Sequence, residues 1–180
     1  IHPDTSELGR VYRPTLAIQA SPITFAAALA DLKPPKDIPW RKETEAAHAD
    51  YLAYTEKATE VPGAMNLGEC VAWLRERLPQ DAILCNGAGN YSGWTHRFYR
   101  HRQFGTQLGP TSGSKGYGIP AAVAAKRLNP DRTVVAFAGD GCFLMNGQEF
   151  ATAVQYDLPV VVVVVDNGMF GTIRMHQERE

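Results

Sequence analysis

Oxygen-bearing side chains follow two apolar runs of the sequence, and this pairing indicates metal chemistry. Asp140 stands between two glycines after the run Thr133 to Ala138, and Asn167 follows six consecutive valines and Asp166. If the two runs are neighbouring parallel strands, both side chains lie at the carboxyl edge of one sheet, where open α/β sheets bind ligands. A carboxylate and an amide oxygen suit Mg²⁺, which takes further ligands from substrate phosphates. The spacing therefore predicts a site for a Mg²⁺-bridged diphosphate.

The residues that follow the first run also suit an anion. A helix is expected to begin at Cys142, and the free N–H groups and positive dipole end of a helix start favour phosphate. Gly139 and Gly141 would let a bulky anion approach the backbone. Asn167-Gly168 is also a hairpin turn signal. The segment after it is short and polar, which makes it a poor partner for an all-valine strand, so the ligand interpretation is favoured.

Helices and strands alternate from residue 67 onward, and this order has to position the polar residues. Residues 67–79 carry apolar side chains three or four apart, as in an amphipathic helix. Short buried strands are expected at residues 82–86, 133–138 and 159–165, and helices at residues 117–130 and 142–157. Strands without polar alternation are typical of a parallel sheet covered by helices on both faces. The predicted fold class is therefore α/β, a three-layer sandwich with a mainly parallel sheet flanked by helices.

Composition excludes several other classes of protein. The formal net charge of -1 argues against broad electrostatic binding to nucleic acid or to an anionic membrane. Cys70, Cys85 and Cys142 have neither zinc-like spacing nor a disulfide pattern, so a reducing, cytoplasmic setting is expected. The valine run is far too short to cross a bilayer. Aromatic and basic residues alternate in residues 94–104, as in single-stranded nucleic-acid binding, but the charge favours a solvated helix there.

The two polar strand ends resemble the signature of thiamine-diphosphate-dependent enzymes, whose usual Asn-Asn ending is Asp166-Asn167 here. Residues 139–178 resemble the acetolactate synthase-like branch in particular, and the match extends upstream through residues 86–130. The resemblance implies three parts of the chain. Residues 1–39 are the tail of a central domain with a linker, residues 40–62 are a helical connector, and residues 63–180 are a thiamine-diphosphate-binding domain truncated at its C-terminus.

The resemblance also implies which residues hold the metal and the cofactor. Asp140 and the Asn167 side chain ligate Mg²⁺, with the Met169 carbonyl completing the protein's share, while Asp166 caps or orients the loop. The implied cofactor-binding residues are Gly89, Asn90 and Tyr91 at the distal phosphate, then Gly113, Lys115, Gly139, Gly141, Cys142, Phe170 and Gly171, with Thr172 and Ile173 on the cofactor's reactive side. For residues 87–93, an ordinary strand-to-helix turn is the alternative, and the glycine spacing is wrong for a dinucleotide fingerprint.

Two positions depart from the family pattern. Gly113 matches the glycine whose carbonyl meets the aminopyrimidine, but the family's large apolar residue two positions later is Lys115 here. Three interpretations compete: a tolerated wedge between the cofactor's rings, a catalytic lysine, or a protein that binds weakly or has lost catalysis. Cys142 stands where the family often has Ser, and a thiol is a poor donor. A reactive thiol is the alternative for Cys142.

Other polar and apolar residues near the motifs have structural explanations. Glu149 could act as a general acid, but a helix residue that ties neighbouring loops is favoured. Met145, Phe143 and Phe150 are at helical spacing and are expected in the core. His176 follows the metal loop and could approach a substrate, although no role is assigned to it.

The resemblance implies an activity for the full-length parent. The ylid of thiamine diphosphate adds to a 2-keto acid, CO₂ leaves, and the carbanion is ligated to a second carbonyl compound or protonated. The implied partner is a pyrimidine-binding domain of the same protein or another subunit, in a homodimer or homotetramer, with FAD possible in the parent. The 180-residue chain alone is expected to be inactive. The alternatives are a non-catalytic binding or regulatory module and a nicotinamide-dependent dehydrogenase.

Overall fold

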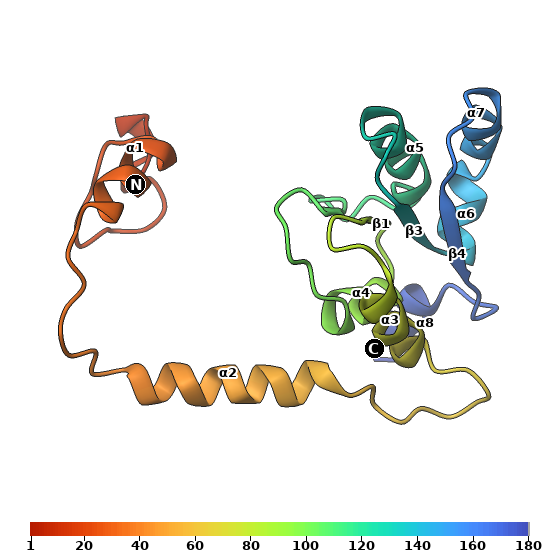
Figure 1. Cartoon of the computed structure of the whole chain (residues 1–180), viewed down its shortest axis with the longest axis horizontal. Helices are drawn as coiled ribbons and strands as arrows, with labels where there is room; N and C mark the ends of the chain where they lie inside the picture. Colours follow the sequence, from red (N-terminus) through yellow and green to blue (C-terminus); the bar gives the residue numbers. More distant parts are fainter. Residues whose placement is uncertain (180) are drawn as a thin grey trace. The chain divides into compact units, whose positions relative to one another are not determined.

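The computed structural model describes residues 1–179, which divide into two compact units, residues 1–46 and residues 47 onward. The smaller unit contains the short 3₁₀ helix η1 (Thr5–Glu7) and α1 (Pro22–Ala30), as Figure 1 shows. Ser21 caps α1, because its side chain accepts a hydrogen bond from the Thr24 N–H. No residue of α1 is buried. The two units divide inside α2 (Arg41–Glu56). This division tests neither of the domain boundaries predicted at residues 39 and 62, which stay predictions.

The larger unit is built on a four-stranded parallel sheet with the strand order β2-β1-β3-β4. The strands are β1 (Ile83–Asn86), β2 (Gln107–Leu108), β3 (Val134–Gly139) and β4 (Val161–Val165). The helices are α3 (Leu67–Arg77), α4 (Ser92–Phe98), α5 (Gly118–Leu128), α6 (Asp140–Asn146), α7 (Glu149–Gln155) and α8 (Gly171–Gln177). In Figure 1, α5 and α7 lie on one side of the strands and α3 and α4 on the other. The predicted α/β class with a mainly parallel sheet flanked by helices is confirmed.

The core lies around the two inner strands. Every residue of β1 and β3 is buried, and Phe137 in β3 is 1% exposed. The small side chains of α5 pack against both strands, with Ala122 fully buried and Ile119 1% exposed. Close packing of this kind makes the sheet a rigid base, because interiors at crystal-like density leave side chains little room to shift. The ends of β1 and β3 are therefore fixed positions for a site.

The prediction of one helix over residues 142–157 is wrong, because the segment forms α6 and α7 with a break at Gly147 and Gln148. The Gly147 N–H donates to the Phe143 carbonyl, and a Cβ at Gly147 would lie 2.7 Å from that oxygen. Only glycine fits this close approach of backbone to backbone, and glycine also weakens a helix interior. The helix also begins at Asp140 rather than at Cys142.

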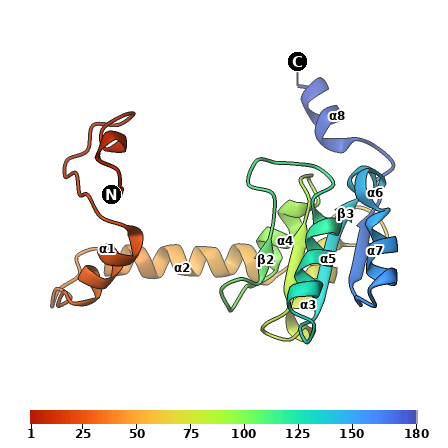
Figure 2. The same ribbon diagram turned by 90° about the horizontal axis from the view of Figure 1, so that it is seen from above.

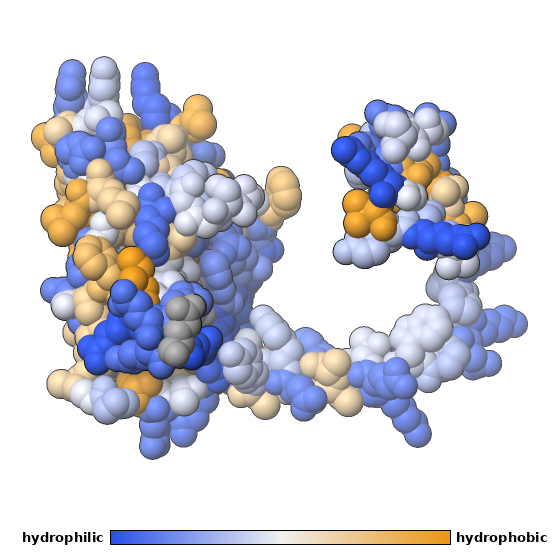
Figure 3. Space-filling model, turned by 180° about the vertical axis from the view of Figure 1, so that it is seen from behind, coloured by the Kyte–Doolittle hydropathy of each residue, from blue (hydrophilic) through white to orange (hydrophobic). Residues whose placement is uncertain are grey.

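The prediction that the valine strand is buried on both faces is also wrong. Among residues 1–179, β4 pairs only with β3, so it is an edge strand, and Val161 and Val164 are 54% and 45% exposed. Leu144 and Val154 on the helices beside it are also exposed. Figure 3 shows hydrophobic residues among hydrophilic ones on one face of the larger unit. An unpaired apolar edge presents free N–H and C=O groups to another strand.

Residues 94–104 form a solvated helix only in part. The helix α4 ends at Phe98, which is fully buried, and Tyr99 after it is 8% exposed. The aromatic residues of this segment therefore anchor it to the core. Among residues 1–179, no helix is long and apolar enough to cross a membrane. The three cysteines all lie in this range, and none of them forms a disulfide.

Candidate functional site

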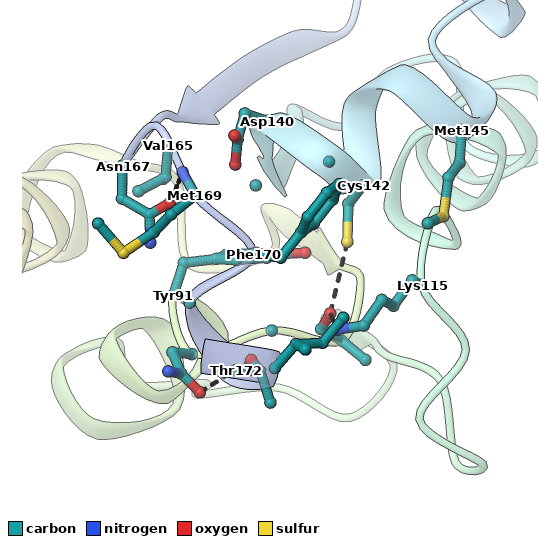
Figure 4. Close-up of a pocket in the computed structure, with 17 residues that line it drawn as sticks. Tyr91, Lys115, Asp140, Cys142, Met145, Val165, Asn167, Met169, Phe170 and Thr172 are labelled. Carbon is teal, nitrogen blue, oxygen red and sulfur yellow. Dashed lines mark hydrogen bonds between the residues drawn. The ribbon is translucent and has the colours of Figure 1, made fainter. Parts of the chain in front are cut away.

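The carboxyl ends of β3 and β4 lie side by side. The two strands are parallel, and their register pairs Gly139 with Val165, the last residue of each. Asp140 comes next after β3, and Asp166 and Asn167 come next after β4. Figure 4 shows Asp140 and Asn167 at the same edge of one pocket. The prediction that the valine strand and the strand before Asp140 are neighbours is confirmed.

The pocket has a volume of about 310 Å³ and is lined by four segments of the chain. They are the loop after β1, the loop before α5, the start of α6, and the turn after β4 with the first turn of α8 (Figures 2 and 4). The lining residues include all the predicted metal and cofactor residues except Gly113, namely Gly89, Asn90, Tyr91, Lys115, Gly139, Asp140, Gly141, Cys142, Asn167, Met169, Phe170 and Gly171, together with Thr172 and Ile173.

Some predicted residues lie elsewhere, and some lining residues were not predicted. Gly113 does not line the pocket, although its φ of +73° shows a turn that favours glycine. Glu149 also lies outside, where its carboxylate accepts a hydrogen bond from Thr152, and His176 does not line the pocket either. The expectation that Met145 and Phe150 are core residues is wrong, because they are 49% and 38% exposed.

Met145 instead joins the pocket wall, as do Ala88 and Val165, which the sequence analysis also missed. Met145 stands three residues after Cys142 in α6. Residues three apart share one face of a helix, so this spacing was the signal for its position. Phe143, by contrast, packs against the core as expected.

The turn after β4 is shaped by its own polar side chains. The Asp166 carboxylate accepts a hydrogen bond from the Gly168 N–H at 2.7 Å, and the Asn167 side-chain oxygen accepts one from the Met169 N–H at 3.1 Å. Gly168 has a φ of +63°, in the left-handed region that suits glycine. These bonds hold the turn open beside Asp140 and agree with the loop-orienting role expected for Asp166.

The oxygen ligands at this edge suit a Mg²⁺ ion. Asp140 offers a carboxylate, Asn167 keeps a second lone pair on its amide oxygen, and the Met169 carbonyl accepts one bond, from the Gly171 N–H at 2.9 Å. All are hard oxygen ligands of the type that Mg²⁺ takes. Residues 1–179 contain no cluster of three His, Cys, Asp or Glu side chains. An ion held here would therefore complete its shell with water or with a ligand's phosphates.

Tyr91 lines the pocket and carries a buried hydroxyl beside Gly87 and Cys142. Its side chain is 8% exposed, and its hydroxyl is buried and has no hydrogen-bond partner among the described residues. Burial raises the pKa of Tyr91, and the neighbouring Cys142 thiol raises it further, so the hydroxyl stays protonated near neutral pH. Gly89 and Gly139 flank the ring, and a Cβ on them would lie 2.7 and 3.1 Å from it. A buried donor without an acceptor fits an anionic ligand such as a phosphate.

The free Tyr91 hydroxyl predicts an unusual substitution effect. In the empty protein, Tyr91→Phe is expected to raise the free energy of unfolding by about 1 kcal/mol, because it removes an unpaired buried polar group. Urea denaturation followed by circular dichroism measures this difference. The control is Tyr12→Phe, at a residue that is 84% exposed, which should leave the stability unchanged. A loss of stability in Tyr91→Phe would contradict this description of the hydroxyl.

The remaining wall of the pocket is held by contacts between loops. Cys142 is 6% exposed, and its thiol donates to the Ala88 carbonyl, with the sulfur and oxygen 3.4 Å apart. The Thr172 hydroxyl donates to the Asn90 side chain at 3.1 Å and ties α8 to the loop after β1. The Phe170 ring lies against Gly141, where a Cβ would be 2.9 Å from the ring. Side-chain contacts thus join all the segments that carry the predicted residues.

Comparisons with known proteins identify the family of this chain. The family model described as "Thiamine pyrophosphate enzyme, C-terminal TPP binding domain" matches residues 87–180. The acetolactate synthase isozyme 1 large subunit of Escherichia coli K12 is 32% identical over 178 residues, which cover 97% of this chain and 31% of that protein. The acetolactate synthase large subunit of Parasynechococcus marenigrum WH8102 is 39% identical over 116 residues, which cover 64% of this chain and 19% of that protein.

A solved structure also matches the chain. The thiamine diphosphate-dependent 4-hydroxybenzoylformate decarboxylase of Rhodococcus jostii RHA1 aligns with a TM-score of 0.64 and 31% identity. The alignment covers 69% of this chain and 24% of that one. This chain therefore spans about a third or less of the length of the proteins that it matches.

Proposed function

The chain belongs to the thiamine pyrophosphate enzymes through their C-terminal TPP-binding domain, and we propose that its pocket binds the Mg²⁺–diphosphate half of thiamine diphosphate. The observation that carries the proposal is the register of β3 and β4, which puts Asp140 and Asn167 at one edge of the pocket. In this proposal Asp140, Asn167 and the Met169 carbonyl hold the ion. The loop after β1 would hold the diphosphate.

Each part of the pocket has a defined task in this proposal. Gly139 and Gly141 leave room for backbone to approach the diphosphate, and the Tyr91 hydroxyl donates to a phosphate oxygen. The contact of Thr172 with Asn90 ties α8 to the loop after β1 and would keep Ile173 in the pocket wall beside the cofactor. When bound, thiamine diphosphate supplies the electron sink for the decarboxylation of a 2-keto acid.

The full-length parent is proposed to be an acetolactate synthase-like enzyme that decarboxylates a 2-keto acid and ligates or releases the product. Its second half-site would be a pyrimidine-binding domain of the same protein or of another subunit in a homodimer or homotetramer. The apolar rim of the pocket supports such a partner, because Met169, Phe170 and Ile173 are 43%, 66% and 50% exposed. FAD in the parent and a cytoplasmic location belong to the same proposal.

A non-catalytic binding module of the same fold is the second candidate. The observation that favours it is Lys115, a charged residue in the pocket wall where the family resemblance implies an apolar wedge. A measurement of turnover separates the two candidates. If the full-length parent is an acetolactate synthase-like enzyme, it should release CO₂ from pyruvate or another 2-keto acid. A folded parent that binds the cofactor and turns over no 2-keto acid would favour the module.

The test of cofactor binding is a calorimetric titration of thiamine diphosphate into the chain, with Mg²⁺ and then with EDTA. The proposal expects saturable binding that is much tighter with Mg²⁺, because Asp140 would hold the ion and the ion would supply positive charge to the diphosphate. Thiamine, which lacks the diphosphate, is the matched ligand control and is expected not to bind measurably. If a chain shown to be folded binds thiamine diphosphate no better than thiamine, the proposed function is wrong.

Replacement of Cys142 with Ser is expected to raise the affinity of the pocket for Mg²⁺–thiamine diphosphate. Its thiol is a weak donor, whereas the hydroxyl of a serine at the same position is a strong one. The serine hydroxyl would turn from the Ala88 carbonyl, to which the thiol donates, toward the diphosphate. Cys142→Ser should therefore tighten Mg²⁺–thiamine diphosphate binding by about threefold, the effect of exchanging one hydrogen bond for a stronger one. Cys70→Ser, at a cysteine outside the pocket, is the control and should leave the affinity unchanged. An unchanged or weaker affinity in Cys142→Ser would show that this position does not meet the diphosphate.

A further inference from the structure

Lys115 holds a positive charge where three segments of the pocket meet. Its ammonium donates to the Ala88 carbonyl, with the nitrogen and oxygen 3.1 Å apart. The same carbonyl accepts the hydrogen bond from the Cys142 thiol at 3.4 Å. Figure 4 shows the Lys115 side chain reaching across the wall toward this junction. The ammonium is thus positioned between the loop after β1 and the start of α6.

The backbone that carries Lys115 is also fixed. The Asn146 side chain in α6 donates to the Gly116 carbonyl at 3.0 Å, which ties the residue next to Lys115 to the helix. Gly116 has a φ of +75°, and a Cβ there would lie 2.8 Å from the Asn146 side-chain nitrogen. Only glycine fits this conformation and this contact. The stem of Lys115 therefore starts from a fixed point beside the pocket.

The charges of the pocket leave Lys115 without a matching anion. Among the described residues that line the pocket, Lys115 is the one lysine or arginine and Asp140 is the one carboxylate. Asp140 is assigned to the metal ion, and none of the ion pairs of the described residues includes Lys115. An ammonium has three N–H groups, and Ala88 uses one of them. Lys115 is exposed, so its two remaining donors bind water until a ligand displaces it.

A second free donor lies at the same wall. A Cβ at Gly87 would lie 2.8 Å from the Tyr91 hydroxyl and 3.4 Å from the Cys142 sulfur, so these two groups are close neighbours. Cys142 in turn shares the Ala88 carbonyl with Lys115. A buried, unpartnered hydroxyl and an ammonium thus converge on one region of the pocket. Convergent donors of this kind recognise an oxyanion with several acceptor oxygens.

We propose that the Lys115 ammonium binds a phosphate oxygen of the cofactor's diphosphate and so provides part of the affinity without Mg²⁺. This inference rests on the proposed function and adds a recognition group to it. It also assigns Lys115 a role other than a ring wedge or a catalytic lysine. The negative charge of a diphosphate exceeds the net positive charge of Mg²⁺ bound to one carboxylate. The Lys115 ammonium would supply further positive charge and so stabilise the complex. The effect is electrostatic and weakens as salt is added.

The test uses inorganic diphosphate as the probe, titrated in EDTA into the wild-type chain and three variants. Lys115→Met removes the charge and keeps a long stem, Lys115→Arg keeps the charge, and Lys57→Met removes a charge from an exposed residue outside the pocket. Lys115→Met is expected to weaken metal-free binding by about tenfold or more, the effect of a charge-assisted hydrogen bond. Lys115→Arg and Lys57→Met are expected to bind nearly as the wild type does. Added NaCl should weaken binding more in the wild type than in Lys115→Met.

Two results would overturn the inference alone. In the first, Lys115→Met binds diphosphate in EDTA as the wild type does, while Mg²⁺-dependent binding through Asp140 is intact. In the second, a parallel titration with pyruvate shows that Lys115→Met loses binding of the carboxylate and keeps that of the diphosphate. Failure of the wild type to bind diphosphate or thiamine diphosphate even with Mg²⁺ would instead overturn the proposed function, and the inference with it.

Discussion

Replacement of Asp140 with Ala is expected to weaken Mg²⁺-dependent binding of thiamine diphosphate by more than about 100-fold, since even residues that only orient metal ligands contribute 10- to 100-fold. Asp140 is the one carboxylate among the described lining residues of the pocket, so no other charged ligand there can replace it. Titration calorimetry with and without Mg²⁺ measures the effect. The metal-free affinity should not fall, because without the ion this carboxylate only repels the diphosphate.

The control for Asp140→Ala is Asp131→Ala, which removes an exposed carboxylate before β3, at the opposite end of the same strand. This variant should bind the cofactor as the wild type does. Asp166→Asn is a second comparison, because an amide oxygen can still accept the hydrogen bond from Gly168. If Asp140→Ala keeps Mg²⁺-dependent affinity, or if Asp131→Ala loses it equally, the ion does not lie at the strand ends.

Truncation of Phe137 to Ala is expected to lower the free energy of unfolding by about 3–5 kcal/mol, as for other fully buried aromatic residues. Phe137 is 1% exposed and lies in β3, the strand that ends just before Asp140. Because single domains are stable by only about 5–15 kcal/mol, the variant should be partly unfolded near physiological temperature. Thermal and urea denaturation followed by circular dichroism measure the loss.

Phe104→Ala provides the matched control, because Phe104 is fully exposed in the loop before β2. Its removal should change the stability by less than about 0.5 kcal/mol. Equal losses in the two variants would mean that the sheet does not have the core described here. The pair therefore tests the fold independently of any ligand.

Much of the fold could be predicted from local patterns. The unbroken apolar runs gave β1, β3 and β4, and the room between Gly141 and Asp166 allowed only a crossover to a parallel neighbour. The break at Gly147 was missed because helical periodicity continues across it, although a glycine weakens a helix interior. The exposure of Val161 and Val164 was missed because an apolar run does not reveal how many neighbours a strand has.

Some features of the site could be predicted from the sequence, and others depend on tertiary contacts. Asp140 and Asn167 could be paired from strand order alone, since parallel strands deliver their carboxyl ends to one edge. The role of Gly89 could not, because a glycine for phosphate approach and a glycine that makes room for the Tyr91 ring have the same sequence signal. The contact between Lys115 and the Ala88 carbonyl joins residues far apart in the chain, and no spacing rule predicts it.

The most direct test of the metal site is a crystal structure of the chain with thiamine diphosphate and Mn²⁺ in place of Mg²⁺, with the metal located by its anomalous scattering. The site described here predicts one strong peak bound by the Asp140 carboxylate, the Asn167 side-chain oxygen and phosphate oxygens. A well-ordered crystal with cofactor bound and no metal between these two side chains would contradict it.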